Sequence, residues 1–266
     1  MIGYVRLNRP PSDSSLFSYV LTMMGLAHHA ETLGRLCYVD WTGGYFPVVY
    51  SDSQASDTKA NMWEWYFEQP HGIVKAPADC ETWTFVEGKY PDEFRYSHWS
   101  VEDLVHKQSV VRRLLRPNSS ALEYATLIQA RYHIEPSKTI AVSYRGNDAV
   151  TDGRNYPKSI ACYFDTVDGL LSDYPDFNVW IQTDDSNAFS EFKQRYPSSL
   201  SIDEFDTISN PSQYVDKVSM KRGYQRGLDA VAKMIILSRC SVMVKNMSNL
   251  SDMASASSHG KIIHIL

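Results

Sequence analysis

The sequence has few cysteines, no excess of positive charge and no long apolar run. Its four cysteines, Cys37, Cys80, Cys162 and Cys240, form no C-x-x-C pair, which argues against a zinc knuckle or a redox dithiol. Lys and Arg total 26 against 31 for Asp and Glu, so no general positive field draws the chain onto a nucleic-acid backbone. No run approaches the roughly 20 apolar residues of a membrane span, and the N-terminus does not have the order of a secretory signal. We expect a cytoplasmic protein with free thiols that binds no nucleic acid and spans no membrane.

Several motifs that identify enzyme classes are also missing. The sequence contains no G-x-G-x-x-G, no G-x-x-x-x-G-K-[ST] and no G-x-S-x-G, which disfavours dinucleotide oxidoreductases, P-loop enzymes and α/β hydrolases. What is present is the composition of a globular protein, with 43% hydrophobic and 21% charged residues. The length of 266 residues fits two domains, at a prior of roughly 150 residues each.

Strand-like and helical runs alternate along the chain, which indicates an α/β protein with largely parallel sheets. A strand at 2–7, a helix ended by Gly34 and a strand at 36–40 form a βαβ unit. The aromatic-rich region from 41 to about 115 has no clear period. Ser120 followed by Glu123 has the spacing of a capping box and predicts a helix to about Tyr132. We place the domain boundary here, giving domains 1–116 and 117–266.

The second domain repeats the alternation more clearly. Strands are predicted at 139–143, 178–183, 241–245 and 261–266, and helices at 160–171, 188–196 and around 228–236. This is the pattern of a second doubly wound unit.

Polar residues follow three of these strands, where ligands gather in open parallel sheets. In the segment 143–148, Arg145 could grip a phosphate with two hydrogen bonds, or it could form a surface pair with Asp148. In the segment 183–187, Asp184 and Asp185 could orient an arginine or hold a ribose, or Asp185 or Ser186 could cap the next helix.

The third polar segment is 246–249, where small hydroxyl and amide side chains, including Ser248 and Asn249, precede a helix. Such a helix start can hold a phosphate. A plain loop with local side-chain hydrogen bonds is the other interpretation.

Together the three segments resemble the fucosyltransferase superfamily of α1,6-fucosyltransferases, nodulation fucosyltransferases and protein O-fucosyltransferases. SYRGND at 143–148 resembles its H-x-R-R-x-D motif, with Ser143 in place of the histidine and Gly146 in place of the second arginine. VWIQTDD at 179–185 is similar to its strand ending in A-T-D-D. LSRCSVMVKNMSNLS at 237–251 is similar to its segment L-L-S-R-x-D-x-x-V-x-x-x-S-S.

The resemblance implies an α/β fold of the GT-B type, in which two Rossmann-like lobes enclose a cleft. Residues 1–116 would form the acceptor-side lobe and 117–266 the lobe that binds the nucleotide-sugar donor. The implied activity is inverting transfer of a sugar, fucose from GDP-fucose, onto a glycan hydroxyl. Because the sequence has no D-x-D, we expect neither a metal nor another cofactor. The implied partners are the nucleotide sugar and the glycan acceptor.

The resemblance also implies roles for individual residues. Arg145 would hold the donor's β-phosphate and stabilise the leaving diphosphate. Asp184 and Asp148 would organise that arginine and its loop, and Asp148 or Asp152 would be the general base.

Other carried-over positions complete the predicted donor site. Ser248 and Asn249 would donate to the phosphates, Asp184 and Asp185 would also belong to the donor- and phosphate-binding residues, and Asp229 would contact the base or the ribose. Two alternatives remain: a non-catalytic nucleotide-sugar or carbohydrate-binding protein with a degenerate transferase fold, and an α/β interaction protein that binds through the aromatic stretch 63–85.

Overall fold

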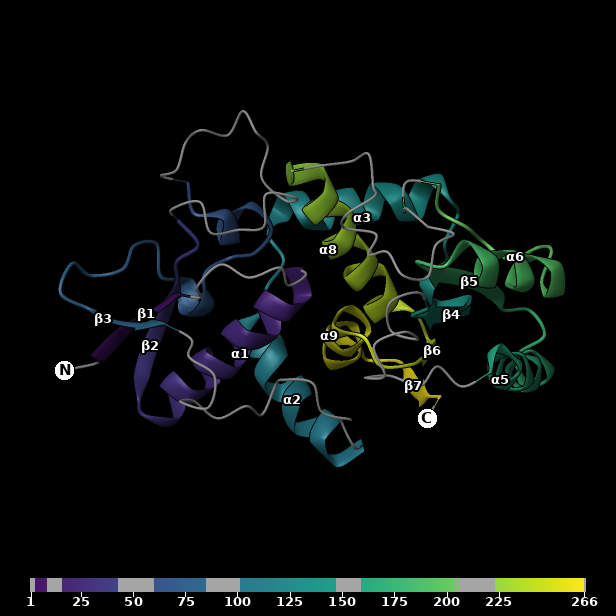
Figure 1. The fold of residues 1–266 in the computed structure, drawn as a ribbon, viewed down its shortest axis with the longest axis horizontal. Helices are drawn as coiled ribbons and strands as arrows, with labels where there is room; N and C mark the ends of the chain where they lie inside the picture. The colour runs from purple at the N-terminus through teal and green to yellow at the C-terminus, as the bar shows by residue number, and fades with distance from the viewer. Residues whose placement is uncertain are drawn as a thin grey trace. The chain divides into compact units, whose positions relative to one another are not determined.

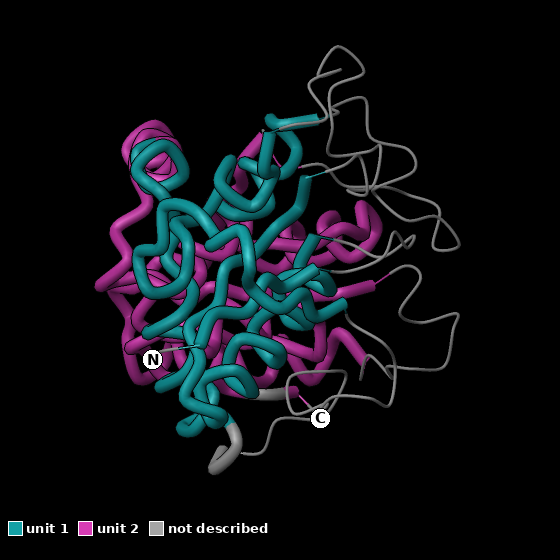
Figure 2. Tube along the Cα trace, turned by 90° about the vertical axis from the view of Figure 1, so that its left-hand side faces the viewer, with its two compact units in different colours: residues 1–123, 221–231 teal, residues 124–220, 232–266 magenta. Residues whose placement is uncertain are grey.

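The computed structural model describes residues 3–8, 16–42, 60–84, 101–146, 159–203, 205 and 223–265. The chain forms two compact units, residues 1–123 with 221–231 and residues 124–220 with 232–266, which Figure 2 shows in two colours. The division falls within helix α3 (Ser119–Arg131) and again within helix α8 (Gly223–Arg239). Residues 221–231 group with the first unit, although chain order places them in the second predicted domain.

The first unit contains a three-stranded parallel sheet in the order β2-β1-β3 (Figure 1). Its strands are β1 (Gly3–Asn8), β2 (Arg35–Val39) and β3 (Glu81–Thr84). Helix α1 (Leu16–Thr32) contacts β1 and β2. Gly34 ends the helix at a φ of 68°, a left-handed conformation that favours glycine. The predicted βαβ unit is confirmed.

The aromatic-rich region forms part of the core of this unit. It contains the short helices η1 (Met62–Trp65) and η2 (Pro70–Gly72), strand β3 and helix α2 (Val101–Leu114). The side chains of Trp63, Tyr66, Phe67 and Trp83 are buried. The ring centroids of Trp63 and Phe67 lie 4.8 Å apart. These four aromatics are core residues, whereas Trp65 is half-buried. Phe85, also in the proposed stretch, lies outside the described residues.

Helix α3 has a different cap from the predicted one. The side chain of Asn118, directly before the helix, accepts a hydrogen bond from the Ala121 N–H at 2.9 Å. Its Nδ2 also donates to the backbone carbonyl of Glu64 at 2.9 Å. Both the oxygen and the nitrogen of the capping side chain are therefore hydrogen-bonded. The prediction that Ser120 caps the helix is wrong, because Asn118 is already placed to satisfy the N–H that opens the helix.

The second unit contains a four-stranded parallel sheet in the order β5-β4-β6-β7. The strands are β4 (Thr139–Tyr144), β5 (Asn178–Thr183), β6 (Val242–Lys245) and β7 (Lys261–His264). Helices α5 (Ile160–Asp173), α6 (Ser186–Arg195), α9 (Asn249–Ser257) and part of α8 accompany it. The strands and helices predicted here are confirmed within a few residues at their ends.

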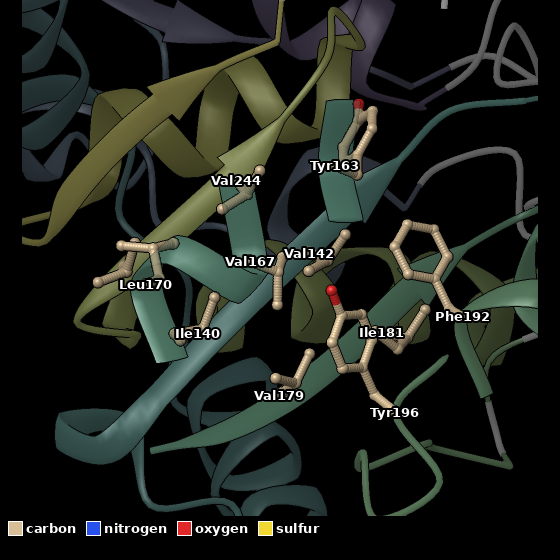
Figure 3. Packing of buried hydrophobic residues seen from close by; sticks show 11 residues of the cluster. Ile140, Val142, Tyr163, Val167, Leu170, Val179, Ile181, Phe192, Tyr196 and Val244 are labelled. Atoms are coloured by element: carbon tan, nitrogen blue, oxygen red, sulfur yellow. The ribbon is translucent and has the colours of Figure 1, made fainter. Parts of the chain in front are cut away.

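A hydrophobic cluster fixes one face of this sheet (Figure 3). Side chains from β4, β5 and β6 pack against α5 and α6, and the members include Ile140, Val142, Val179, Ile181, Val244, Tyr163, Val167, Leu170 and Phe192. Burial of a large apolar side chain contributes about 1.5–3 kcal/mol. The cluster therefore gives the carboxyl ends of the strands a rigid support.

All four cysteines are free. Cys37 and Cys240 are buried, and burial raises the pKa of each thiol to about 12. Cys80 and Cys162 are half-buried. Among the helices that the structure describes, none has the length and hydropathy to cross a membrane.

Candidate functional site

Three polar residues meet at the carboxyl edge of the second sheet. Arg145 follows β4, Asp184 follows β5 and Asn246 follows β6. Strand β4 lies between the other two strands, and Ser143 pairs in register with Gln182 on one side and with Lys245 on the other. Because all three strands are parallel, their carboxyl ends share one edge of the sheet.

Asp184 holds both the side chain of Arg145 and the loop that follows it. Nη1 of Arg145 donates to Oδ2 of Asp184, and the Gly146 N–H donates to Oδ1 at 3.2 Å. The Asp184 side chain is 9% exposed and that of Arg145 is 31% exposed. The carboxylate therefore anchors a guanidinium that still reaches solvent.

Asn246 clamps the backbone of Arg145. Its Oδ1 accepts from the Arg145 N–H at 2.9 Å, and its Nδ2 donates to the Arg145 carbonyl at 2.9 Å. The amide side chain thus satisfies both backbone groups of this residue, which follows the last residue of β4. Sequence interpretation placed Asn246 in a polar segment but missed this role; an amide immediately after a buried strand is the signal that could have indicated it.

Gly146 and Asp185 lie in close contact beside this clamp. A Cβ atom at position 146 would lie 2.6 Å from Oδ2 of Asp185, and that side chain has little freedom to move. It caps α6, accepting from the N–H groups of Asn187 at 2.8 Å and Ala188 at 3.2 Å. Of the roles left open for Asp185, the structure shows the helix cap.

The start of α9 supplies further backbone donors. Ser248 is the N-cap, and its Oγ accepts from the Ser251 N–H at 3.1 Å. The N–H groups of Asn249 and Leu250, in the first turn, have no hydrogen-bond acceptor among the described residues. Open N–H groups at a helix N-terminus, together with the helix dipole, favour an anion.

A buried ion pair connects helix α9 to strand β6. The side chain of Lys245 is fully buried, and its Nζ donates to Oδ1 of Asp252 in α9. Beside it in the sheet, the Ser143 hydroxyl donates to Oε1 of Gln182 at 3.1 Å. A lysine in the strand and a carboxylate in the helix therefore fix α9 to the sheet.

The pKa of Tyr144, which precedes Arg145, reflects the charges around it. Its ring packs edge-on against Tyr163 and Phe192. Burial raises the pKa of its phenol above the ordinary value, and the negative charges of Asp185, Glu191 and Asp184 raise it further. Negative charge thus gathers on one side of the edge, and Arg145 provides the positive charge.

Three further residues were predicted for the site. Asp229 belongs to the first unit, where its buried carboxylate accepts from Nε2 of Gln225 at 2.9 Å. Asp148 and Asp152 lie outside the described residues. In the part of the chain that the structure describes, no group of three or more His, Cys, Asp or Glu side chains could hold a metal ion.

The arrangement is suited to binding an oxyanion at the sheet edge. It combines a partly exposed guanidinium, fixed by a carboxylate, with open N–H groups at the start of a helix. Both donate to phosphate oxygens in proteins. The structure brings Arg145 together with Asp184, and it places Ser248 and Asn249 at the turn that follows the neighbouring strand β6.

The fold is similar to those of several solved fucosyltransferase structures. A structure of NodZ α1,6-fucosyltransferase soaked with GDP-fucose superposes with a TM-score of 0.55 at 12% identity, covering 97% of this chain and 93% of that chain. A further NodZ structure in the comparison comes from Bradyrhizobium. A variant of Arabidopsis thaliana FUT1 in complex with GDP gives a TM-score of 0.54 at 12% identity, covering 98% of this chain and 70% of that chain.

POFUT1 in complex with GDP superposes with a TM-score of 0.51 at 12% identity, covering 98% of both chains. No family model matches the chain, and no curated protein sequence matches it. At this identity the likeness concerns the fold, and it confirms the fold class expected from the sequence. The chain has a fucosyltransferase-like fold of the GT-B type, built from Rossmann-like α/β units.

Proposed function

We propose that this protein is an inverting, metal-independent glycosyltransferase that moves fucose from GDP-fucose onto a glycan hydroxyl. The observation that carries the proposal is the position of Arg145, held by Asp184 and Asn246 at the carboxyl edge of a parallel sheet. The fold similarity to NodZ and POFUT1, whose structures contain GDP-fucose or GDP, supports the choice of donor. In this proposal residues 117–266 provide the donor lobe and residues 1–116 the acceptor lobe.

The proposed reaction is a single displacement at the anomeric carbon. The acceptor oxygen forms a bond to C1 of the sugar while the bond from C1 to the β-phosphate oxygen breaks, so GDP leaves with the electron pair. Negative charge grows on the diphosphate during this step, where fixed donors lower the barrier most. Arg145 would supply that stabilisation, and the open N–H groups of Asn249 and Leu250 would add to it.

The acceptor hydroxyl must also lose its proton. We assign this role to a carboxylate of the loop after β4, Asp148 or Asp152, since a general base needs to reach the hydroxyl directly. Ser248 would contribute to phosphate binding through the turn that it caps. Asp229 is proposed as the contact to the base or the ribose.

Nucleotide binding tests the proposal most directly. Thermal stabilisation by GDP, UDP and dTDP should be measured on the wild type, since a ligand at 100 times its dissociation constant adds about 2.7 kcal/mol to stability. The key variant is Arg145→Ala, which removes charge-assisted hydrogen bonds of about 1.5–3 kcal/mol each. The matched control is Arg195→Ala, because Arg195 also pairs with an aspartate, Asp168, but on the surface of α6.

We expect a GDP-selective shift that Arg145→Ala abolishes and Arg195→Ala preserves. Transfer of labelled fucose from GDP-fucose should then fall by well over tenfold in Arg145→Ala. A tenfold or smaller loss would contradict the role of Arg145. A retained GDP shift with no turnover on any glycan would favour a binding protein with a degenerate transferase fold, and selectivity for another base would change the donor.

A further inference from the structure

A rigidly held carboxylate belongs to the first unit, whereas Arg145 belongs to the second. Glu64, in η1, accepts three hydrogen bonds on its Oε1: from the Tyr38 hydroxyl at 3.1 Å, from Nε2 of Gln69 at 2.9 Å and from Nδ2 of Asn61 at 3.5 Å. Its Oε2 has no hydrogen-bond partner among the described residues, and the residue is exposed. One oxygen is therefore fixed by the protein while the other faces solvent.

The donors to Glu64 are themselves fixed to the sheet. Gln69 accepts from the Val39 N–H at 2.8 Å and donates to the Val39 carbonyl at 2.9 Å. Asn61 accepts from the Trp41 N–H at 2.9 Å and donates to the Val39 carbonyl at 2.7 Å. Both amide side chains are buried, each 8% exposed. They continue the hydrogen bonding of the backbone at the end of β2. The Glu64 carboxylate is therefore held, through these two amides, by the backbone of the strand.

The face of β1 and β2 that carries Arg6 and Tyr38 has further hydrogen-bonding groups. Arg6 and Tyr38 are register partners in β1 and β2, and both are half-buried. Nε of Arg6 lies 3.5 Å from the carboxylate of Asp40, which follows β2. Trp65, next to Glu64, is also half-buried. The partly exposed ring of Tyr38 lies beside these fixed polar groups, near the carboxyl end of parallel strands, where ligands gather in such sheets.

We propose that Oε2 of Glu64, with the phenol of Tyr38, forms a subsite that binds hydroxyl groups of a neutral carbohydrate. A sugar hydroxyl donates to the carboxylate and can accept from the Arg6 guanidinium. The Tyr38 phenol donates its own proton to Oε1 of Glu64, so it offers the sugar an acceptor. The charge of Arg6 is balanced by Asp40, so a cation would meet the negative charge of Glu64 but would leave the Arg6 guanidinium without an acceptor from the ligand. A hydroxyl group uses both the acceptor and the donor of this face. The inference rests on the proposed function, for which this subsite would hold part of the glycan acceptor.

A purely structural role for Glu64 predicts a different result. In that case Oε1 alone matters, because it satisfies the buried amides of Asn61 and Gln69. Glu64→Gln separates the two roles: its side-chain oxygen can still accept from the three donors, while an NH₂ group replaces Oε2 and removes the open acceptor. Glu68→Gln is the matched control, since Glu68 is exposed in the same segment.

Ligand binding measured by saturation-transfer NMR and titration calorimetry tests the inference. The probes are neutral oligosaccharides of galactose, mannose and N-acetylglucosamine, a lysine-rich peptide of similar length, and GDP in separate titrations. We expect at least one oligosaccharide to bind the wild type and Glu68→Gln, and to bind Glu64→Gln at least tenfold more weakly. The urea midpoint and the GDP affinity should stay unchanged in both variants.

The other outcomes separate the two proposals. Binding of GDP but of no oligosaccharide, or oligosaccharide binding unaffected by Glu64→Gln, overturns this subsite and leaves the donor site intact. Oligosaccharide binding lost in Glu64→Gln without any GDP binding supports the subsite and contradicts the proposed transferase. Peptide binding that disappears in Glu64→Gln overturns the carbohydrate assignment in favour of a cationic ligand, and a lowered urea midpoint in that variant overturns it in favour of a structural role.

Discussion

The Asn246 clamp can be tested by exchanging one group of its side chain. In Asn246→Asp, Oδ1 can still accept from the Arg145 N–H, but an oxygen replaces the Nδ2 that donates to the Arg145 carbonyl at 2.9 Å. Two acceptors then face each other at a position that is 4% exposed. An unsatisfied buried group costs about 1–3 kcal/mol, and the buried charge places the expected loss of unfolding free energy near the upper end of that range.

Urea denaturation at neutral pH measures this loss, with the midpoint and the slope determined separately. Asn249→Asp is the matched control, because it makes the same chemical change at the first residue of α9. A negative charge there stabilises the helix by about 0.3–1 kcal/mol, so the two variants should shift the midpoint in opposite directions. A change of less than about 0.5 kcal/mol in Asn246→Asp, the size typical of surface substitutions, would refute the clamp.

The pH dependence of Asn246→Asp gives a second test of the same geometry. When the new carboxyl is protonated, its O–H can donate to the Arg145 carbonyl again. Its folded-state pKa should therefore lie above its unfolded-state pKa, so the restored stability is present at low pH and is lost as pH rises through the folded-state pKa. The deficit relative to the wild type should shrink between neutral pH and about pH 4. A constant deficit would point to altered packing instead.

Two further predictions concern ionisable groups. Lys245→Met removes one partner of a buried ion pair and should lower the free energy of unfolding by about 3–5 kcal/mol, measured by urea denaturation. Lys245→Met combined with Asp252→Leu should recover most of this loss. Equal losses in the single and double variants would show that the pair does not form. Burial lowers the pKa of His71 below its usual 6.5, against the opposing charge of Glu31, so the unfolded state binds the proton first and stability should fall as pH drops below 6.5. His71→Asn, which tolerates the backbone φ of 60° at this position, should show a weaker pH dependence over pH 7 to 5; identical slopes would contradict the assignment.

The contact between Arg145 and Asp184 could be predicted from the sequence because both residues directly follow buried apolar strands. Once these strands are parallel neighbours, their following residues share one edge. Strand order is not a local property, and it places β4 between β5 and β6. That order brings Asn246 to the Arg145 backbone.

Other features escaped prediction because local propensity does not determine them. Lys245 is fully buried, although lysine is almost never fully buried unless it is paired, and its partner Asp252 becomes apparent only when α9 packs on the sheet. The described aromatics after residue 42 contact different elements instead of one face: Trp63 contacts Trp41, Trp65 contacts Tyr224 and Trp83 contacts His29. Ser120 has the spacing of a capping box, but Asn118 forms the cap.

The two sheets place opposite chemistry at their carboxyl ends, and this difference supports a division of binding roles. The second unit presents the Arg145 guanidinium and open helix N–H groups, which attract a diphosphate. The first unit presents the Glu64 carboxylate, which would repel one: two unit charges 4 Å apart interact by about 1 kcal/mol in water and by more in a less polar site. A carboxylate pays no such penalty with a neutral hydroxyl and accepts its hydrogen bond. A donor with a charged leaving group is therefore suited to the Arg145 edge, and an uncharged acceptor to the face that carries Glu64.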